Sequence, residues 1–214
     1  MKRNFCKASL TMLPYDMLMV ILAKIGAFSS VDLWSCMVSC KTFLEVAKYP
    51  EVLRSLRLED VFLPPYERVP NGMDLLKECA KSGNVHGTFL CGLFNFFYLK
   101  NVKEGLKQLA TAAKEAHSEA MYLYGMISLI EGVFDEGSNY LTQLWRNQGI
   151  ESVRQCQMNV RWVVLEMSVR QYREYDILLS LMEIGEECRH INLNEVCDEC
   201  FIRKEIYRFM DYMN

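Results

Sequence analysis

The stretch Leu13–Leu58 reads LPYDMLMVILAKIGAFSSVDLWSCMVSCKTFLEVAKYPEVLRSLRL. It begins with Leu13-Pro14, and proline suits the first position of a helix, where its missing N–H leaves no hydrogen bond unmade. Apolar residues then recur every three or four positions, which is typical of an amphipathic helix. They are Met17, Leu18, Ile21, Leu22 and Ile25. Gly26 follows the last of them and predicts the end of this helix.

Two or three further short helices are predicted in the same stretch. Ser29 or Ser30 can cap the second helix, with Asp32 in its first turn. An apolar stripe follows in that helix, formed by Leu33, Trp34, Met37 and Val38. A third helix ends at Pro50, and a short fourth covers Glu51–Leu58. Three or four short helices here make a small helical unit by the usual domain scale.

The order of residues in this stretch resembles an F-box. That motif begins with Leu-Pro, continues with Leu and an Ile-Leu pair, places Asp-Leu before the second helix, and then has a Val-x-Cys-Lys-x-Phe element. The matching positions are Leu13-Pro14, Leu18, Ile21-Leu22, Asp32-Leu33 and Val38-Ser39-Cys40-Lys41-Thr42-Phe43. A generic three-helix module with an apolar core is the alternative interpretation.

The resemblance implies docking onto a Skp-type adaptor and, through it, onto a cullin in a ubiquitin ligase. The adaptor-binding positions it implies are Leu13, Pro14, Leu18, Ile21, Leu22, Leu33, Val38, Lys41 and Phe43. The family usually has Leu-Pro near the end of the first helix, whereas this chain reads Ile25-Gly26-Ala27-Phe28. We therefore expect a loop there that binds the adaptor less tightly.

Composition excludes several classes of protein. Of the 214 residues, 51% are hydrophobic, which is too many for a disordered chain, and the net charge of −3 creates no field that attracts nucleic acid. The longest apolar stretches fall short of the ~20 residues that a membrane-spanning helix needs. There are nine cysteines, and no apolar segment of a signal peptide follows Lys2 and Arg3. We expect an intracellular protein of the cytoplasm or nucleus with reduced thiols.

The chain divides into five predicted segments. They are an arm over 1–12, the F-box over 13–58, a linker with three prolines over 59–72, a helical repeat domain over 73–184, and a Cys/His-containing segment with a terminal helix over 185–214. Every segment with a readable pattern is helical. The predicted fold class is therefore all-α.

An internal repeat runs through the predicted repeat domain. Gly87–Leu93 aligns with Ala120–Met126, so Gly92 and Gly125 occupy the same position in the two segments. Small residues at matched positions let neighbouring helices approach closely, and stacked units bury the apolar face that one unit leaves open. The pattern resembles the Sel-type branch of tetratricopeptide-like repeats, and a plain helical bundle is the alternative.

Two repeat units are fewer than the three or more usually needed for stability, so flanking helices should cap them. Met73–Ser82 is predicted on one side, and a long helix over Ile150–Met182, with a break near 173–176, on the other. Four arginines punctuate that helix at 154, 161, 170 and 173. They indicate a solvated face, with a basic groove for an acidic partner as the alternative.

Four potential zinc ligands lie near the C-terminus: Cys188, His190, Cys197 and Cys200. A Cys-x-x-Cys pair supplies half of a tetrahedral zinc site, because two thiolates at that spacing can reach one ion. The sequence thus predicts a compact structural zinc site on a tight loop, followed by an amphipathic helix over Phe201–Tyr212. Ordinary reduced cysteines are the alternative, and no other cofactor is expected.

The sequence carries no recognised catalytic motif. Phosphate loops rich in glycine, Gly-x-Ser-x-Gly and His-Glu-x-x-His are all missing. His86 and His117 occupy matching positions between repeats and are interpreted as structural. A Cys91–His117 nucleophile and base pair is conceivable but has no local support.

The whole chain resembles a plant group of small F-box proteins with a short Sel-type region and a Cys-containing tail. The resemblance implies a non-catalytic substrate receptor of a Skp–cullin–F-box ubiquitin ligase, whose repeats hold a client protein. No nucleic acid and no membrane are expected as partners. The alternative function is a helical-repeat interaction scaffold, stabilised by zinc, that does not join a ligase.

Overall fold

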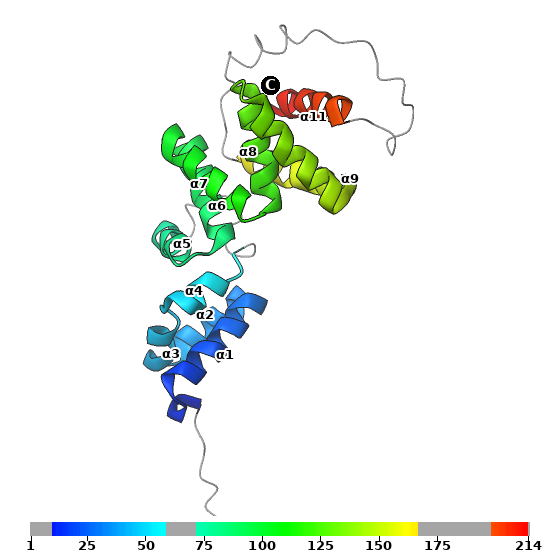
Figure 1. The fold of residues 1–214 in the computed structure, drawn as a ribbon. Coiled ribbons are helices and arrows are strands. Elements are labelled where there is room, and N and C mark those ends of the chain that lie inside the picture. Colours follow the sequence, from blue (N-terminus) through cyan, green and yellow to red (C-terminus); the bar gives the residue numbers. More distant parts are fainter. Residues whose placement is uncertain (1–9, 59–71, 167–197, 214) are drawn as a thin grey trace, which may run out of the picture. The chain divides into compact units, whose positions relative to one another are not determined.

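The computed structural model describes residues 10–58, 72–166 and 198–213, and in these ranges the chain forms helices and turns without a strand (Figure 1). The all-α prediction is therefore confirmed. The elements are η1 (Leu10–Met12), α1 (Tyr15–Phe28), α2 (Ser30–Ser39), α3 (Lys41–Val46), α4 (Pro50–Ser55), α5 (Gly72–Lys81), α6 (Val85–Leu93), the π-helical η3 (Phe94–Tyr98), α7 (Val102–Lys114), α8 (Ser118–Ile130), α9 (Phe134–Glu166) and α11 (Asp198–Met213). None of these helices is both long and apolar enough to cross a membrane.

Contacts group the chain into two compact units, residues 1–90 (the N-terminal unit) and 91–214 (the C-terminal unit). The division falls within α6, so α5 and the start of α6 belong with α1–α4. The predicted linker over 59–72 lies outside the described residues except for its last residue, Gly72. The five predicted segment boundaries stay predictions.

The helices of the N-terminal unit pack around a core of leucine and valine. The buried set includes Leu18, Leu22, Leu33, Val46, Val52, Leu53 and Leu56. Ser29 begins α2 as predicted, because its side chain accepts a hydrogen bond from the N–H of Asp32 at 3.1 Å. Pro50 is the first residue of α4, where its missing N–H costs nothing, whereas Pro14 lies just before α1.

Gly26 does not end α1, contrary to the prediction from sequence. It is buried inside the helix, and a Cβ there would lie 3.1 Å from Leu33 Cδ2. Its carbonyl accepts a hydrogen bond from the N–H of Arg57 at 2.9 Å. The glycine therefore permits close approach of other helices, and the loop expected over residues 25–28 is the last turn of α1.

The repeat is more regular in the backbone than in the sequence. Left-handed conformations recur at Gly83 (φ 85°), Ala116 (φ 59°) and Gly149 (φ 81°), which are equally spaced along the chain. Each ends one helix before the next begins, so α9 is two helices joined across the kink at Gly149. A third repeat helix therefore begins after Gly149. It is described to Glu166, and the rest of the helix predicted over Ile150–Met182 lies outside the described residues.

The residue after each left-handed position begins the next helix. Asn84 Oδ1 accepts from the N–H of Gly87 at 2.8 Å, and His117 Nδ1 accepts from the N–H of Ala120 at 3.3 Å. His117 therefore corresponds to Asn84, and the predicted match between His117 and His86 is wrong. The structural role expected for His117 is explained by this cap.

Glycines bring the helices of the C-terminal unit into close contact. A Cβ on Gly105 would lie 2.6 Å from the backbone nitrogen of Phe96, and one on Gly137 would lie 2.7 Å from the carbonyl oxygen of Gly125. These distances are shorter than real Cβ contacts, so the two helix backbones lie so close together that only the hydrogen atom of a glycine fits between them. The expectation that matched small residues permit close helix packing is confirmed at Gly92 and Gly125, where a Cβ would lie 2.9 Å from Leu109 Cγ and 3.2 Å from the carbonyl oxygen of Gly137.

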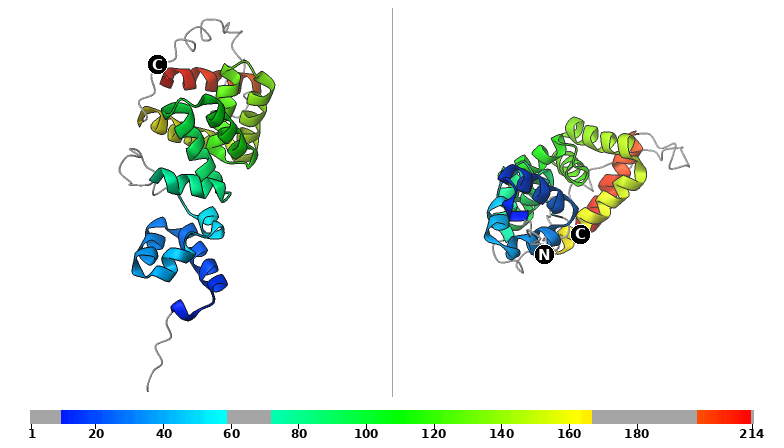
Figure 2. Two further views of the ribbon diagram at one scale, coloured as in Figure 1. Left: turned by 90° about the vertical axis from the view of Figure 1, so that its left-hand side faces the viewer. Right: turned by 90° about the horizontal axis from the view of Figure 1, so that it is seen from below.

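The predicted amphipathic terminal helix is present as α11, in red beside α9 in Figures 1 and 2. Phe201 stacks on Trp145 of α9 with ring centroids 4.6 Å apart, and Phe209 meets Tyr122 of α8 edge to face. Glu205 is 1% exposed and pairs with Arg208 at 2.6 Å. Burial raises the pKa of Glu205, although the Arg208 guanidinium opposes this shift.

We expect Gly105→Ala to lower the free energy of unfolding by about 1 to 3 kcal/mol, because the new methyl group overlaps the backbone at Phe96. Helix propensity alone predicts the opposite sign, since alanine is about 1 kcal/mol better than glycine inside a helix. Urea denaturation measures the change, with exposed Lys103→Ala on the same helix as control. Stabilisation by Gly105→Ala would contradict the close approach.

Candidate functional site

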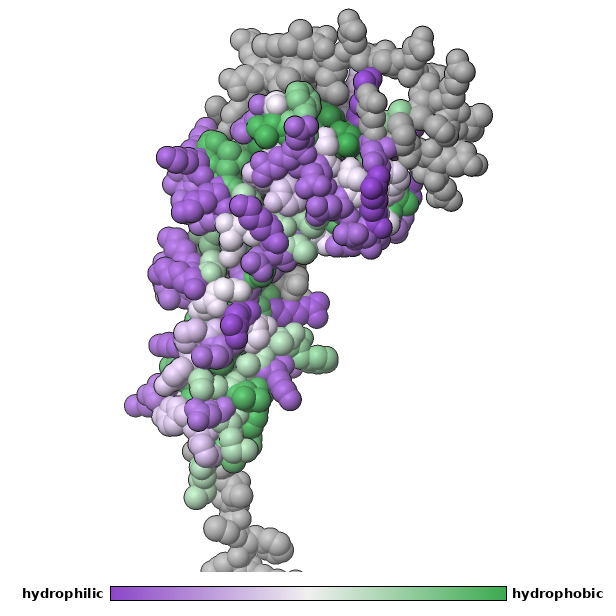
Figure 3. Space-filling view, in the orientation of Figure 1, coloured by the Kyte–Doolittle hydropathy of each residue, from purple (hydrophilic) through white to green (hydrophobic). Residues whose placement is uncertain are grey.

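The N-terminal unit exposes many large apolar side chains. They are Leu10, Met12, Tyr15, Met17, Val20, Phe28, Val31, Trp34, Val38, Leu44 and Tyr49. Figure 3 shows green hydrophobic residues among purple hydrophilic ones on the visible face of this unit. Apolar surface gathered in this way on a small unit usually marks an interaction site.

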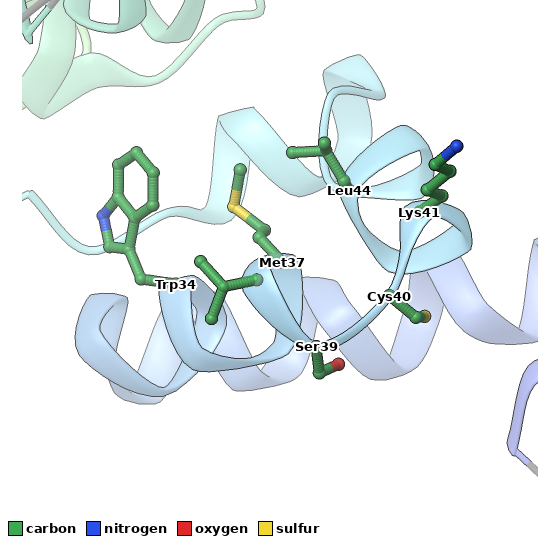
Figure 4. A pocket seen from close by; sticks show the side chains of 7 residues that line it. Trp34, Met37, Ser39, Cys40, Lys41 and Leu44 are labelled. Carbon is green, nitrogen blue, oxygen red and sulfur yellow. The ribbon is translucent and has the colours of Figure 1, made fainter.

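A pocket of about 540 Å³ lies where α2 turns into α3. Its lining consists of Trp34, Met37, Val38, Ser39, Cys40, Lys41 and Leu44. In Figure 4 the side chains of Trp34, Met37 and Leu44 extend to the same side, whereas Ser39 points away from them. The first two lie three residues apart on α2, a spacing that brings them to one face of a helix. We call this site the α2–α3 pocket.

The side chains that line the pocket differ in exposure. Val38 is 81% exposed and Trp34 is 39% exposed, while Met37 and Cys40 are half-buried. Lys41 is exposed beside them and supplies a positive charge. An apolar surface with one cation suits a partner that presents an apolar side chain next to an acidic group.

The nine adaptor-binding positions implied by the sequence divide into two groups. Leu18, Leu22 and Leu33 are at most 2% exposed, and this corrects their predicted role, because a side chain in the core cannot contact a partner. The other six are half-buried or exposed: Leu13, Pro14, Ile21, Val38, Lys41 and Phe43. The motif leucines therefore hold the helices together, and the remaining positions are available at the surface.

Sequence reasoning missed three pocket residues. Trp34 and Met37 appeared only as part of an apolar stripe, and Leu44 only as one of the residues of the predicted third helix before Pro50. The stripe itself carried a usable signal, because Leu33 and Val38 are five residues apart, lie on well-separated sides of the helix, and cannot both face inward unless α2 is covered on a wide arc. Which side of that arc faces the core depends on how α1 and α4 pack.

The predicted zinc ligands fall mostly outside the described residues. Cys188, His190 and Cys197 are in the range 167–197, and only Cys200 is described. Cys200 is half-buried in the first turn of α11, so this ligand begins a helix and does not lie on the predicted loop. Within the described ranges no three His, Cys, Asp or Glu residues are grouped as a metal site would require. The zinc site stays a prediction.

The candidate catalytic pair has structural roles in this fold. Nδ1 of His117 caps α8, and Cys91 is 3% exposed within α6. Another cysteine, Cys156, is also buried, and burial raises the pKa of its thiol to about 12. Since the thiolate is the nucleophile, Cys156 is unreactive near neutral pH.

The chain is similar to known plant proteins. Residues 60–165 match the model of the family described as plant tetratrico peptide repeats. F-box protein At2g35280 of Arabidopsis thaliana is 32% identical over 132 residues, which cover 62% of this chain and 80% of that protein. Putative F-box protein At1g67623 of the same plant is 32% identical over 134 residues, or 61% of this chain and 44% of that protein.

A third Arabidopsis thaliana relative, F-box protein At1g67340, is 27% identical over 117 residues, which cover 54% of this chain and 31% of that protein. The similarity thus spans less than half the length of the second and third relatives. No solved structure matches the chain.

The division between core and surface gives a stability test. We expect Leu22→Ala to lower the free energy of unfolding by about 2 to 5 kcal/mol, because it leaves a cavity in the core. Val38→Ser should change it by less than about 0.5 kcal/mol, since that side chain is in solvent. Chemical denaturation of both variants measures the difference, and equal losses would show that the two positions are not core and surface.

Proposed function

This chain belongs to the family of plant F-box proteins with a helical repeat region, and we propose that it is the substrate receptor of a Skp–cullin–F-box ubiquitin ligase. Helices α1–α4 bind the Skp-type adaptor, and the repeats bind a client protein. The observation that carries the proposal is the α2–α3 pocket, because it places an apolar surface within the segment that matches the F-box motif.

The energetics of the pocket favour a protein partner. Fully burying one large apolar side chain contributes about 1.5 to 3 kcal/mol. Trp34, Val38 and Leu44 are 39%, 81% and 38% exposed, so covering them contributes part of the free energy of a specific contact, and the other exposed apolar residues of α1–α4 must add to it to offset the costs of association. Lys41 pairs with an acidic group at the rim, where it affects orientation and association rate more than affinity.

The proposed protein performs no bond chemistry. Its contribution is to hold a client near the ligase, which raises the effective concentration of client lysines at the site of transfer. Close-packed repeat helices suit this task, because a client bound to them keeps a defined position. The cap that His117 provides for α8 and the burial of Cys91 within α6 support a non-catalytic role.

The alternative function is an interaction scaffold that does not join a ligase. The observation in its favour is the departure at Ile25–Phe28, where the chain lacks the Leu-Pro of the family. Phe28 ends α1 and is 81% exposed, so this position presents a large aromatic side chain to solvent.

We predict that Val38→Glu weakens binding to a purified Skp-type adaptor at least about tenfold, or ~1.4 kcal/mol, because a carboxylate would be buried in an apolar contact. Isothermal titration measures the affinity. Val102→Glu is the matched control, since Val102 is an exposed valine on α7 in the C-terminal unit.

Two results would count against the receptor function as proposed. If the unchanged protein shows no adaptor binding at micromolar concentration, the scaffold replaces the receptor. If Val38→Glu binds as tightly as the unchanged protein, adaptor docking does not use the α2–α3 pocket. Leu22→Ala is unsuitable for this experiment, because loss of a core leucine would reduce binding through unfolding.

We also propose a structural zinc ion held by Cys188, His190, Cys197 and Cys200. The Cys-x-x-Cys spacing at the start of α11 supports it, since ligands at a helix start can anchor that helix. Metal analysis of the purified protein should find about one zinc per chain, reduced by Cys200→Ser but not by Cys36→Ser. A zinc content below about one tenth per chain in the unchanged protein would exclude the site.

A further inference from the structure

Asn84 lies at the turn between α5 and α6 and is 4% exposed. Its backbone N–H donates to the carbonyl of Cys79 at 3.0 Å and so closes the end of α5, while Gly83 before it is left-handed. Its side-chain Oδ1 accepts from the N–H of Gly87 at 2.8 Å and so begins α6. One residue therefore ends one helix and starts the next.

The amide nitrogen of Asn84 makes two further hydrogen bonds to a different helix. Nδ2 donates to the carbonyl of Leu53 at 3.0 Å and to the carbonyl of Leu56 at 2.8 Å. Leu53 is in the last turn of α4 and Leu56 follows that helix directly. Both amide hydrogens and the amide oxygen are thus used in a buried site, where an unmade hydrogen bond would be costly.

The same contact is reinforced on both sides. A Cβ on Gly87 would lie 3.3 Å from Leu58 Cδ1 and from Cys79 Cβ, so the start of α6 packs tightly against the segment after α4 and against α5. On the other side of α4, Ser55 Oγ donates to the carbonyl of Ala23 in α1 at 3.1 Å. A path of hydrogen bonds and packing therefore joins α1, α4 and α6 within the N-terminal unit, and every step of it is among the described residues.

The next turns of the repeat show why an amide is present here. Capping needs only an acceptor, and His117 supplies one at the corresponding position of the next repeat. Ile150, at the same position one repeat further on, has no polar side chain. Aspartate, serine or threonine would cap α6 as well as asparagine does. The amide of Asn84 adds two hydrogen-bond donors, which bond the carbonyls of Leu53 and Leu56 at the end of α4.

We propose that Asn84 is a positioning residue that fixes the first repeat helices to the F-box. The three buried side-chain hydrogen bonds of Asn84 hold the turn between α5 and α6 against α4, so α5 and the start of α6 move with α4 within the N-terminal unit. Its value for presenting a client depends on the proposed receptor function, because a defined position matters only if the F-box docks on a ligase. The joint itself does not depend on that function.

Two variants separate the joint from the cap. Asn84→Ser keeps a capping oxygen and removes both amide donors. Asn84→Asp also keeps the cap, has nearly the same shape, and places a carboxylate oxygen against the two carbonyls of α4. His117→Ser is the matched control, because it makes the same kind of change at the next turn of the repeat.

Pulsed EPR measures the distance between two spin labels, each attached to a non-canonical residue that replaces Lys24 of α1 or Lys77 of α5. Both positions are exposed and both lie in the N-terminal unit. The unchanged protein and His117→Ser should give one narrow distance distribution. Asn84→Ser and Asn84→Asp should broaden the distance distribution roughly twofold. Helix content measured by circular dichroism should stay the same, because the two amide donors hold the start of α6 against α4 and do not stabilise either helix by itself.

A distribution as narrow in folded Asn84→Ser as in the unchanged protein would overturn the proposal. If Asn84→Asp fails to fold, Asn84→Ser gives the result, because it introduces no charge. The distances are measured without an adaptor. Adaptor binding of the same proteins is measured separately, so a failure of the unchanged chain to bind would refute the receptor function and leave the joint intact.

Discussion

Direct backbone contact between helices is the constraint on which the repeat region depends. Where Gly105 meets Phe96 and Gly137 meets Gly125, the chains are so close that a methyl group would overlap the backbone. Close approach increases the dispersion contacts made by the large side chains on either side, such as Leu109 and Leu141, which are fully buried. Left-handed turns recur at equal intervals and repeat the same geometry along the chain.

The N-terminal unit uses its apolar residues in two opposite ways. Leu18, Leu22 and Leu33 fill the core, whereas Trp34, Val38 and Leu44 lie around a surface pocket. Neighbouring residues such as Leu33 and Trp34 thus belong to different environments although both are large and apolar. A short helix exposes part of its circumference, so a wide apolar arc serves folding on one side and binding on the other.

Much of the fold was predictable because it depends on local pattern. Apolar spacing predicted the helices, Ser29 predicted the start of α2, and matched glycines predicted close packing within the repeat. The failures came from residues with two possible meanings. Gly26 was interpreted as a helix end, and in the fold it is a contact point between helices. His86 was matched with His117, and the backbone shows that Asn84 is the true counterpart.

The sequence by itself determined that the chain is helical, where most helices begin, and that its first stretch resembles an F-box. These properties follow from interactions between residues a few positions apart, which a pattern records directly. Only the tertiary structure decided which leucines are core, where the pocket lies, and that Asn84 bonds α4. The partners of Asn84 are 28 and 31 residues away in the chain, and no local rule relates an amide to carbonyls at that separation. Packing brings them together, so the joint could be found only in the folded molecule.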